Sequence, residues 1–280
     1  MVSMKKKKPL GKGNSQKRIG MVLGTILLVG IVLVAALLIM LQRKRIQRQP
    51  MQTQYVDWEQ CEPGTVVEKN KLDLDHIDRY FTVEEISQEM AEDMQGKSYR
   101  DNPDIAIEDL RYLKVLHYNF DHEIQVGELV VNQEIAQDCR EIFLELFQQE
   151  YEIKSMRRID EFYSEDGDGE TADCNSINND NTSGFNYRLV DGTKVLSSHA
   201  LGYAIDINPT ENPTMAGAGQ GIPAREYLEW ETYSNRRVQR PHMIQTGDVC
   251  YEIFKKHGFI WGGEWNGPLD FQHFEKRTEQ

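Results

Sequence analysis

The first 48 residues lack any acidic side chain. All 45 Asp and Glu lie beyond Arg48, whereas 11 of the 32 Lys and Arg lie at or before it. The rest of the chain therefore has 21 basic and 45 acidic residues, a formal charge of −24. Because contacts with phosphates need Lys and Arg, this acidic part excludes nucleic acid as the expected partner, and it is typical of a soluble surface.

A second absence is that of any charge from Ile19 to Leu41. About 20 apolar residues cross a bilayer as a helix, and this stretch supplies them without the polar stripe of a soluble helix. A cleaved signal peptide is the alternative, but its apolar part is usually about 7–15 residues and ends in small residues. Seven basic residues precede the stretch and four follow it. The positive-inside rule then predicts a single-pass cell-membrane anchor with a cytoplasmic N-terminus and the remaining chain outside.

These features divide the chain into four expected parts. Residues 1–18 form a basic cytoplasmic tail, 19–41 the transmembrane anchor, 42–104 a stalk with an accessory helical segment, and 105–280 the domain that carries the chemistry. In the accessory segment, apolar residues between Leu72 and Gly96 recur at helical spacing and predict one or two short helices. We find no chemistry in this segment and interpret it as packing support or a spacer.

Beyond residue 105, helical and strand patterns alternate without a regular strand–helix–strand rhythm. The predicted fold class is therefore α+β, a small and mainly antiparallel sheet with flanking helices, preceded by one transmembrane helix. The expected strands are 114–120, 151–159, 203–207, 259–261 and 271–275; the expected helices carry the apolar face Ile135–Phe147 and span 247–257; 160–183 is expected to be a long loop.

The four cysteines include no C-x-x-C pair, which argues against a zinc site made of cysteines. Outside the cell they can form disulfides, and four cysteines allow three full pairings. Buried or unpaired thiols are the alternative. The cysteines are Cys61, Cys139, Cys174 and Cys250.

Three residues in two short segments have the chemistry of metal ligands. A catalytic zinc site needs three protein ligands and one open position, and His199, Asp206 and His273 can supply the three. Asp206 interrupts an apolar strand, where a buried carboxylate needs a partner or a metal. Asp270 precedes His273 by three residues and is a candidate general base. Taken singly, each is more often an ordinary surface or core residue than a functional one.

Together, the two segments resemble the zinc D-alanyl-D-alanine carboxypeptidases, a family that includes VanY-type carboxypeptidases and phage L-alanyl-D-glutamate endopeptidases. The shared pattern is S-x-H-x-x-G-x-A-x-D from Ser197, then W-G-G-x-W from Trp261 and D-x-x-H-F-E from Asp270. Residues 127–132 and 181–188 also look like family segments, the second bearing an arginine. The resemblance covers roughly Ile105 to Glu275.

The resemblance implies a zinc metallopeptidase with the fold shared by these enzymes and hedgehog signalling domains. His199, Asp206 and His273 would bind Zn²⁺. Asp270 would take a proton from water and pass it to the leaving amine. Arg188 would hold the scissile carbonyl or the developing oxyanion, since a fixed guanidinium stabilises charge that appears in the transition state.

Three positions near these motifs leave questions for the structure. The alanine expected before Phe185 is Gly184 in this chain. Trp261 and Trp265 either contact the substrate or pack in the core, and the core is favoured because large aromatic side chains mostly bury area.

The implied function is hydrolysis of peptidoglycan stem peptides, with D-alanyl-D-alanine carboxypeptidase first and an L-alanyl-D-glutamate-type endopeptidase as the alternative. A third hypothesis is a non-catalytic wall-binding module, against which the presence of both Asp270 and Arg188 argues. A carboxypeptidase needs a cationic side chain to bind the free carboxylate of its substrate. The candidates for this role are Arg225, Arg236, Arg237 and Arg240. Their positions are explained equally well if they are ordinary solvated surface residues.

Overall fold

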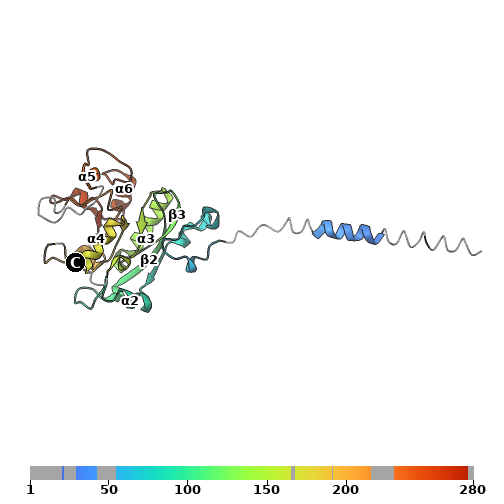
Figure 1. Cartoon of the computed structure of the whole chain (residues 1–280), viewed down its shortest axis with the longest axis horizontal. Helices are drawn as coiled ribbons and strands as arrows, with labels where there is room; N and C mark the ends of the chain where they lie inside the picture. The colour runs from blue at the N-terminus through green and yellow to red at the C-terminus, as the bar shows by residue number, and fades with distance from the viewer. Residues whose placement is uncertain are drawn as a thin grey trace, which may run out of the picture. The chain divides into compact units, whose positions relative to one another are not determined.

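The computed structural model of the chain (Figure 1) describes residues 21, 30–42, 55–164, 168–190, 192–215 and 230–276. Met1–Gln54 and Tyr55–Gln280 form two separate compact units. In the first unit, residues 30–42 are helical. Among the residues described, no helix combines the length and the apolar character needed to cross a membrane. The predicted tail at 1–18 and much of the predicted anchor at 19–41 lie outside the described residues, so both stay predictions.

The second unit is organised around a three-stranded antiparallel sheet. Its two long strands, β2 (Leu110–Tyr118) and β3 (Ile124–Asn132), form a hairpin, and β1 (Thr82–Glu85) pairs with the other side of β2. The α3 helix (Gln133–Gln148) starts where β3 ends and packs on this sheet (Figure 1). Its first turn is capped by Asn132, whose side chain accepts a hydrogen bond from the Glu134 amide. The apolar face predicted for this helix is buried, as expected.

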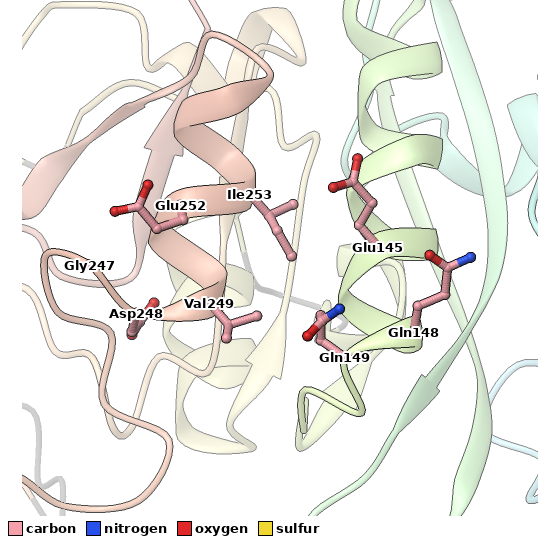
Figure 2. Close-up of a pocket in the computed structure, with 8 residues that line it drawn as sticks. All are labelled: Glu145, Gln148, Gln149, Gly247, Asp248, Val249, Glu252 and Ile253. Carbon is pink, nitrogen blue, oxygen red and sulfur yellow. The ribbon is translucent and has the colours of Figure 1, made fainter.

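A second helix, α6 (Val249–Lys256), packs beside α3 and also buries its apolar side. Asp248 caps it by accepting from the Tyr251 amide. A pocket lies between the two helices, and Figure 2 shows side chains of both lining it. None of the predicted site residues is among those that line it. The lining residues are Glu145, Gln148, Gln149, Gly247, Asp248, Val249, Glu252 and Ile253.

Two further small sheets complete the unit. One is antiparallel with the order β6–β8–β7, formed by β6 (Ala204–Asp206), β8 (His273–Glu275) and β7 (Ile260–Trp261). The other pairs β4 (Ser155–Met156) with β5 (Asn181–Thr182) in parallel. The α+β class with small, mainly antiparallel sheets is therefore confirmed for the second unit. The remaining short helices are η1 (Trp58–Gln60), η2 (Lys69–Lys71), η4 (Ile107–Asp109), η5 (Ile159–Phe162), η6 (Ser198–Leu201), η7 (Gly262–Glu264) and α5 (Trp230–Ser234).

The long loop predicted for residues 160–183 is wrong, because the α4 helix (Gly169–Asn178) lies within it. Asp168 caps this helix by accepting from the Thr171 amide. Its buried face mixes Ala172 and Ile177 with Asp173 and Ser176. A helix that buries polar side chains leaves no clear apolar period in the sequence, which is why the pattern failed here. The strand predicted for 151–159 is likewise reduced to β4.

The accessory segment contributes η3 (Leu74–Tyr80), β1 and α2 (Gln88–Met94). Tyr80 and Phe81 are buried in the same core as the main sheet. The compact unit begins at Tyr55 and contains this segment, and the boundary expected at residue 105 stays a prediction. Cys61, Cys139 and Cys250 are free thiols, which matches the alternative to disulfides for these three; Cys139 and Cys250 are buried, and Cys61 is half-buried.

His117 in β2 predicts a pH dependence of stability. Its side chain is 2 % exposed, and burial lowers its pKa to about 4 although Nδ1 contacts the Tyr118 carbonyl oxygen at 3.2 Å. An unfolded histidine titrates near pH 6.5, so between about pH 6.5 and 4 only the unfolded state takes up this proton. The free energy of unfolding should fall across that window as the pH falls, by about 3 kcal/mol from this residue.

Urea denaturation at several pH values checks this. His117→Gln should flatten the slope between pH 6.5 and 4, whereas His76→Gln, which changes a side chain that is 74 % exposed, should not. An unchanged slope in His117→Gln would show that other groups cause the acid sensitivity.

Candidate metal centre

The pairing of β6 with β8 brings two of the predicted ligands together, because Asp206 lies directly opposite His273 in the antiparallel register. The third, His199, comes from η6. Ser197 begins this turn by accepting a hydrogen bond from the His199 amide, and Gly202 ends it in the left-handed region at φ 73°. All three side chains are buried, and one ligand atom from each lies within 4.8 Å of the others.

The three atoms that face one another are His199 Nε2, Asp206 Oδ1 and His273 Nδ1. The distance between the two histidine nitrogens is 3.2 Å, and Asp206 Oδ1 lies 3.2 Å from His199 Nε2 and 3.0 Å from His273 Nδ1. Ligands at about 2.0–2.1 Å from a tetrahedral zinc ion lie roughly 3.3 Å from one another. The triangle therefore has nearly the size of one face of a zinc tetrahedron, and its donor set leaves the fourth position for water or substrate.

Each of these side chains is oriented by a contact on its far side. His199 Nδ1 donates to the Gly184 carbonyl oxygen at 2.7 Å. Asp206 Oδ2 accepts from Gln272 Nε2 at 3.0 Å. His273 Nε2 lies 3.5 Å from Ser198 Oγ and 3.6 Å from Glu275 Oε2. Such outer contacts fix the tautomer and the direction of metal-binding side chains, and the sequence motifs alone did not assign these roles to Gln272, Glu275 or the Gly184 carbonyl.

The electrostatics of the triangle call for a positive charge at its centre. Because Nδ1 of His199 donates to Gly184, Nε2 of the neutral ring is an acceptor, and it faces a second acceptor, Asp206 Oδ1, at 3.2 Å. Burial lowers the pKa of His273, but contacts with Asp206 and Glu275 outweigh it and raise that pKa to about 10. Burial raises the pKa of Asp206, but the two histidines hold it well below its usual range. A bound cation satisfies the same demand, so these residues fit a zinc ion.

Asp270 differs from Asp206 in its surroundings. Its backbone amide donates to Gly262 O at 3.1 Å, and its side-chain Oδ1 is buried without a hydrogen-bond partner among the described residues. Burial, together with the negative charge of Asp206, raises the pKa of Asp270 to about 7. A carboxyl group with this pKa can both take up and release a proton near neutral pH. A Cβ on Gly262 would collide with the Asp270 carbonyl, so the glycine of the W-G-G run lets the two segments meet.

Arg188 forms an ion pair with a residue of α4. Its Nη2 lies 3.0 Å from Asp173 Oδ2 in α4, and its carbonyl accepts from the Ser197 amide, beside the turn that carries His199. The charge of Asp173 also contributes to the raised pKa of Asp270, so Asp173 acts electrostatically on the candidate base. The sequence does not reveal the role of Asp173 as a partner of Arg188, because its pattern predicts a loop where the structure has α4.

The two tryptophans have different environments. Trp261 is 4 % exposed and its Nε1 donates to the Phe271 carbonyl oxygen at 2.8 Å, so it is a core residue as expected. Trp265 is half-buried, and its ring centroid lies 5.2 Å from that of His273. For Trp265 the core expectation is therefore wrong, because it borders the candidate ligands.

The four arginines suggested for binding the substrate carboxylate also differ in their environments. Arg236 donates to the carbonyl oxygens of Glu211 and Ile244, and its guanidinium carbon lies 4.2 Å from the Phe271 ring centroid. It therefore ties backbone segments together. Arg225 lies outside the described residues, Arg237 is exposed and Arg240 is half-buried.

Gly184 allows a test of the outer contacts. A Cβ at this position would lie 2.5 Å from the Val130 carbonyl oxygen, so the expected alanine would push the segment away. Since Gly184 O orients His199, we expect Gly184→Ala to weaken zinc binding about tenfold or more. Competition with a chromophoric chelator measures this. Gly267→Ala is the matched control, because a Cβ there meets nothing within 4 Å. Equal zinc affinities of the two variants would contradict the orienting role.

The chain was compared with known proteins and families. Residues 191–276 match the family model described as D-alanyl-D-alanine carboxypeptidase. The match covers less than a third of the chain but holds His199, Asp206, Asp270 and His273, and Arg188 lies three residues before it. No curated protein and no solved structure matches the chain. The match supports a metallopeptidase and confirms the resemblance seen in the motifs: residues 191–276 are similar to the D-alanyl-D-alanine carboxypeptidase family.

Proposed function

We propose that this protein is a zinc-dependent peptidase that hydrolyses D-amino-acid-containing stem peptides of peptidoglycan, in the first place by removing a terminal D-alanine. The observation that carries the proposal is the triangle of His199 Nε2, Asp206 Oδ1 and His273 Nδ1 with the Asp270 carboxyl group beside it. The family match covers all four of these residues.

The residues of the chain divide the chemistry among them. His199, Asp206 and His273 would hold the zinc ion, which when bound supplies Lewis acidity that makes water a better nucleophile near neutral pH. Asp270 takes the proton of the attacking water and returns it to the leaving amine, which its pKa of about 7 suits. Arg188 presents its guanidinium to the carbonyl oxygen as negative charge develops there.

Hydrolysis is favoured over a binding module by the environment of Asp270. A buried carboxyl oxygen without a hydrogen-bond partner costs stability, and binding alone gives no reason to retain it. Carboxyl groups with a raised pKa beside a candidate metal site are typical of catalytic acids and bases. The endopeptidase alternative shares this chemistry and differs in the bond that is cut.

The location is part of the proposal. The uncharged stretch from Ile19 to Leu41, with more basic residues before it than after it, supports an anchor with the peptidase unit outside the cell membrane. Peptidoglycan lies in that space, and a stalk between anchor and enzyme lets a tethered site reach nearby stem peptides.

The first measurement incubates the zinc-loaded full chain with a stem pentapeptide and with a cross-linked muropeptide and identifies products by mass. We expect loss of one D-alanine, abolished by a chelator and restored by zinc. Asp270→Asn should keep its zinc but lower kcat by about 10²–10⁴, since it removes the proton carrier. Internal cleavage would select the endopeptidase. No cleavage of either substrate by folded, zinc-loaded protein would contradict catalysis and favour the binding module.

Arg188 makes a separate prediction on the same substrate. Arg188→Ala should lower kcat by about 10²–10³ with a smaller change in KM, because charge stabilisation is needed mainly in the transition state. Zinc content is measured alongside to separate this effect from loss of the metal. A change confined to KM would assign Arg188 to substrate binding instead.

A further inference from the structure

The last part of the accessory segment, taken here from Gln88 through the adjoining Ile105, contacts Tyr187, the residue that precedes Arg188. The Tyr187 amide donates to the Ser98 carbonyl oxygen at 2.9 Å. The Tyr187 hydroxyl donates to Asp104 Oδ2 at 2.6 Å, and the Arg100 guanidinium carbon lies 4.7 Å from the ring centroid. Tyr187 is only 8 % exposed. Its backbone, ring and hydroxyl are thus all held by residues 98–104.

A small apolar core joins the same two parts of the chain. It is distinct from the main core and contains Met94, Tyr99 and Ile105 of the accessory segment together with Phe185, Tyr187 and Ala200. The rings of Tyr99 and Phe185 are 6.4 Å apart. Phe185 follows the glycine whose carbonyl orients His199, and Ala200 follows His199 itself. The accessory segment therefore packs against the backbone on both sides of the candidate site loop.

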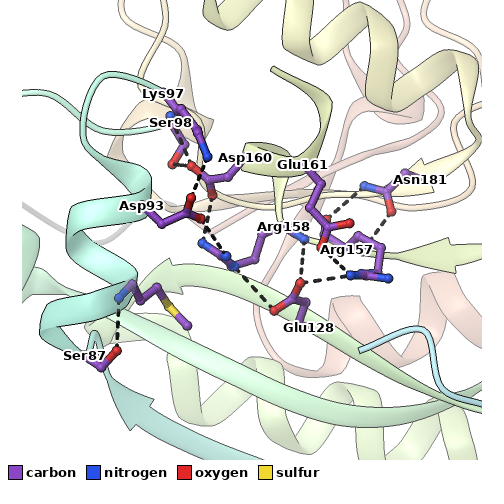
Figure 3. Close-up of polar contacts among 11 residues, drawn as sticks. Ser87, Asp93, Lys97, Ser98, Glu128, Arg157, Arg158, Asp160, Glu161 and Asn181 are labelled. Atoms are coloured by element: carbon purple, nitrogen blue, oxygen red, sulfur yellow. Dashed lines mark hydrogen bonds and ion pairs between the residues drawn. The ribbon is translucent and has the colours of Figure 1, made fainter. Parts of the chain in front are cut away.

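Buried polar contacts fix the accessory segment to the body of the unit (Figure 3). The amide and the hydroxyl of Ser98 both donate to Asp160 Oδ1, at 3.3 and 2.6 Å. Arg158 then links Asp160 at 3.3 Å to Asp93 at 3.0 Å and to Glu128 of β3 at 3.4 Å. Glu128 and Asp160 are buried, so this network is strongly constrained in geometry. The Ser98 carbonyl that receives Tyr187 therefore has a fixed position relative to the main sheet.

On its other side, Arg188 meets α4. Besides the ion pair with Asp173, its Cβ lies 3.1 Å from where a Cβ on Gly169 would be, so the helix start packs closely on the arginine. Arg188 thus contacts α4, while the residue before it, Tyr187, is held by the accessory segment. A side chain that stabilises a transition state acts best when its position is set before the substrate arrives.

We propose that Tyr187 is a positioning residue for Arg188, and that the accessory segment from Gln88 to Ile105 is a structural part of the active site through Ser98, Arg100 and Asp104. This inference rests on the proposed function, in which Arg188 stabilises developing charge. It concerns residues that all lie before the family match at 191–276.

The test removes the outer contacts to Tyr187 with the double variant Arg100→Ala/Asp104→Ala. Both side chains are exposed, so the variant keeps its core and its fold. We expect kcat on the stem peptide to fall about three- to tenfold, with zinc content unchanged. The matched control is Arg79→Ala, whose guanidinium carbon lies 5.7 Å from the Tyr80 ring in the same unit, and its kcat should equal that of the wild type.

A double-mutant cycle separates positioning from general destabilisation. In an Arg188→Ala background, the Arg100→Ala/Asp104→Ala changes should cause no further loss of kcat, because the group they position is gone. The inference would be overturned if Arg100→Ala/Asp104→Ala lowered kcat as much in the Arg188→Ala background as in the wild type. It would also be overturned if the Arg100→Ala/Asp104→Ala variant kept the wild-type kcat. In both cases activity of the wild type would leave the proposed function standing. No cleavage by the wild type would reject both.

Discussion

The burial of one carboxylate, that of Asp206, determines the layout of the candidate site. The side chain is 3 % exposed in the short β6 strand, and taking a carboxylate out of water costs several kcal/mol unless opposite charge and hydrogen bonds compensate. The β8 strand brings His273 to it, Gln272 lies just before that strand, and the η6 turn brings His199. The local structure around β6 thus surrounds this charge with two imidazoles and the amide donor of Gln272.

The same constraint separates the roles of the two carboxyl groups. Asp206 faces two imidazoles and an amide donor, which keep it ionised and suited to be a ligand. Asp270 lies near that negative charge with its Oδ1 buried, and both effects raise its pKa to about 7. Environments that push two neighbouring carboxyl groups to opposite protonation behaviour are how proteins assign one of them to charge and the other to proton transfer.

The parts of this arrangement that could be predicted from the sequence are those that depend on residues close together in the chain. The α3 helix has a clear apolar period, and the ligand chemistry of His199, Asp206 and His273 lies in two short segments. The parts that the sequence does not reveal depend on contacts between residues far apart in the chain. Gln272 orients Asp206 across 66 positions, and Asp173 meets Arg188 from a helix whose buried face is partly polar. No local pattern distinguishes such residues from ordinary polar ones.

The accessory segment shows most clearly why a motif does not define the extent of a site. The bond from the Tyr187 amide to the Ser98 carbonyl oxygen uses backbone groups only, so no particular residue type at either position reveals it. Asp104 and Tyr187 are 83 positions apart, and the compact unit that contains both begins at Tyr55, well before the motifs. In the role proposed for Arg188, its guanidinium needs a backbone fixed as firmly as the metal ligands are. Ser98, Arg100 and Asp104 hold the preceding residue, Tyr187, so the proposed active site extends beyond the segment that resembles the family.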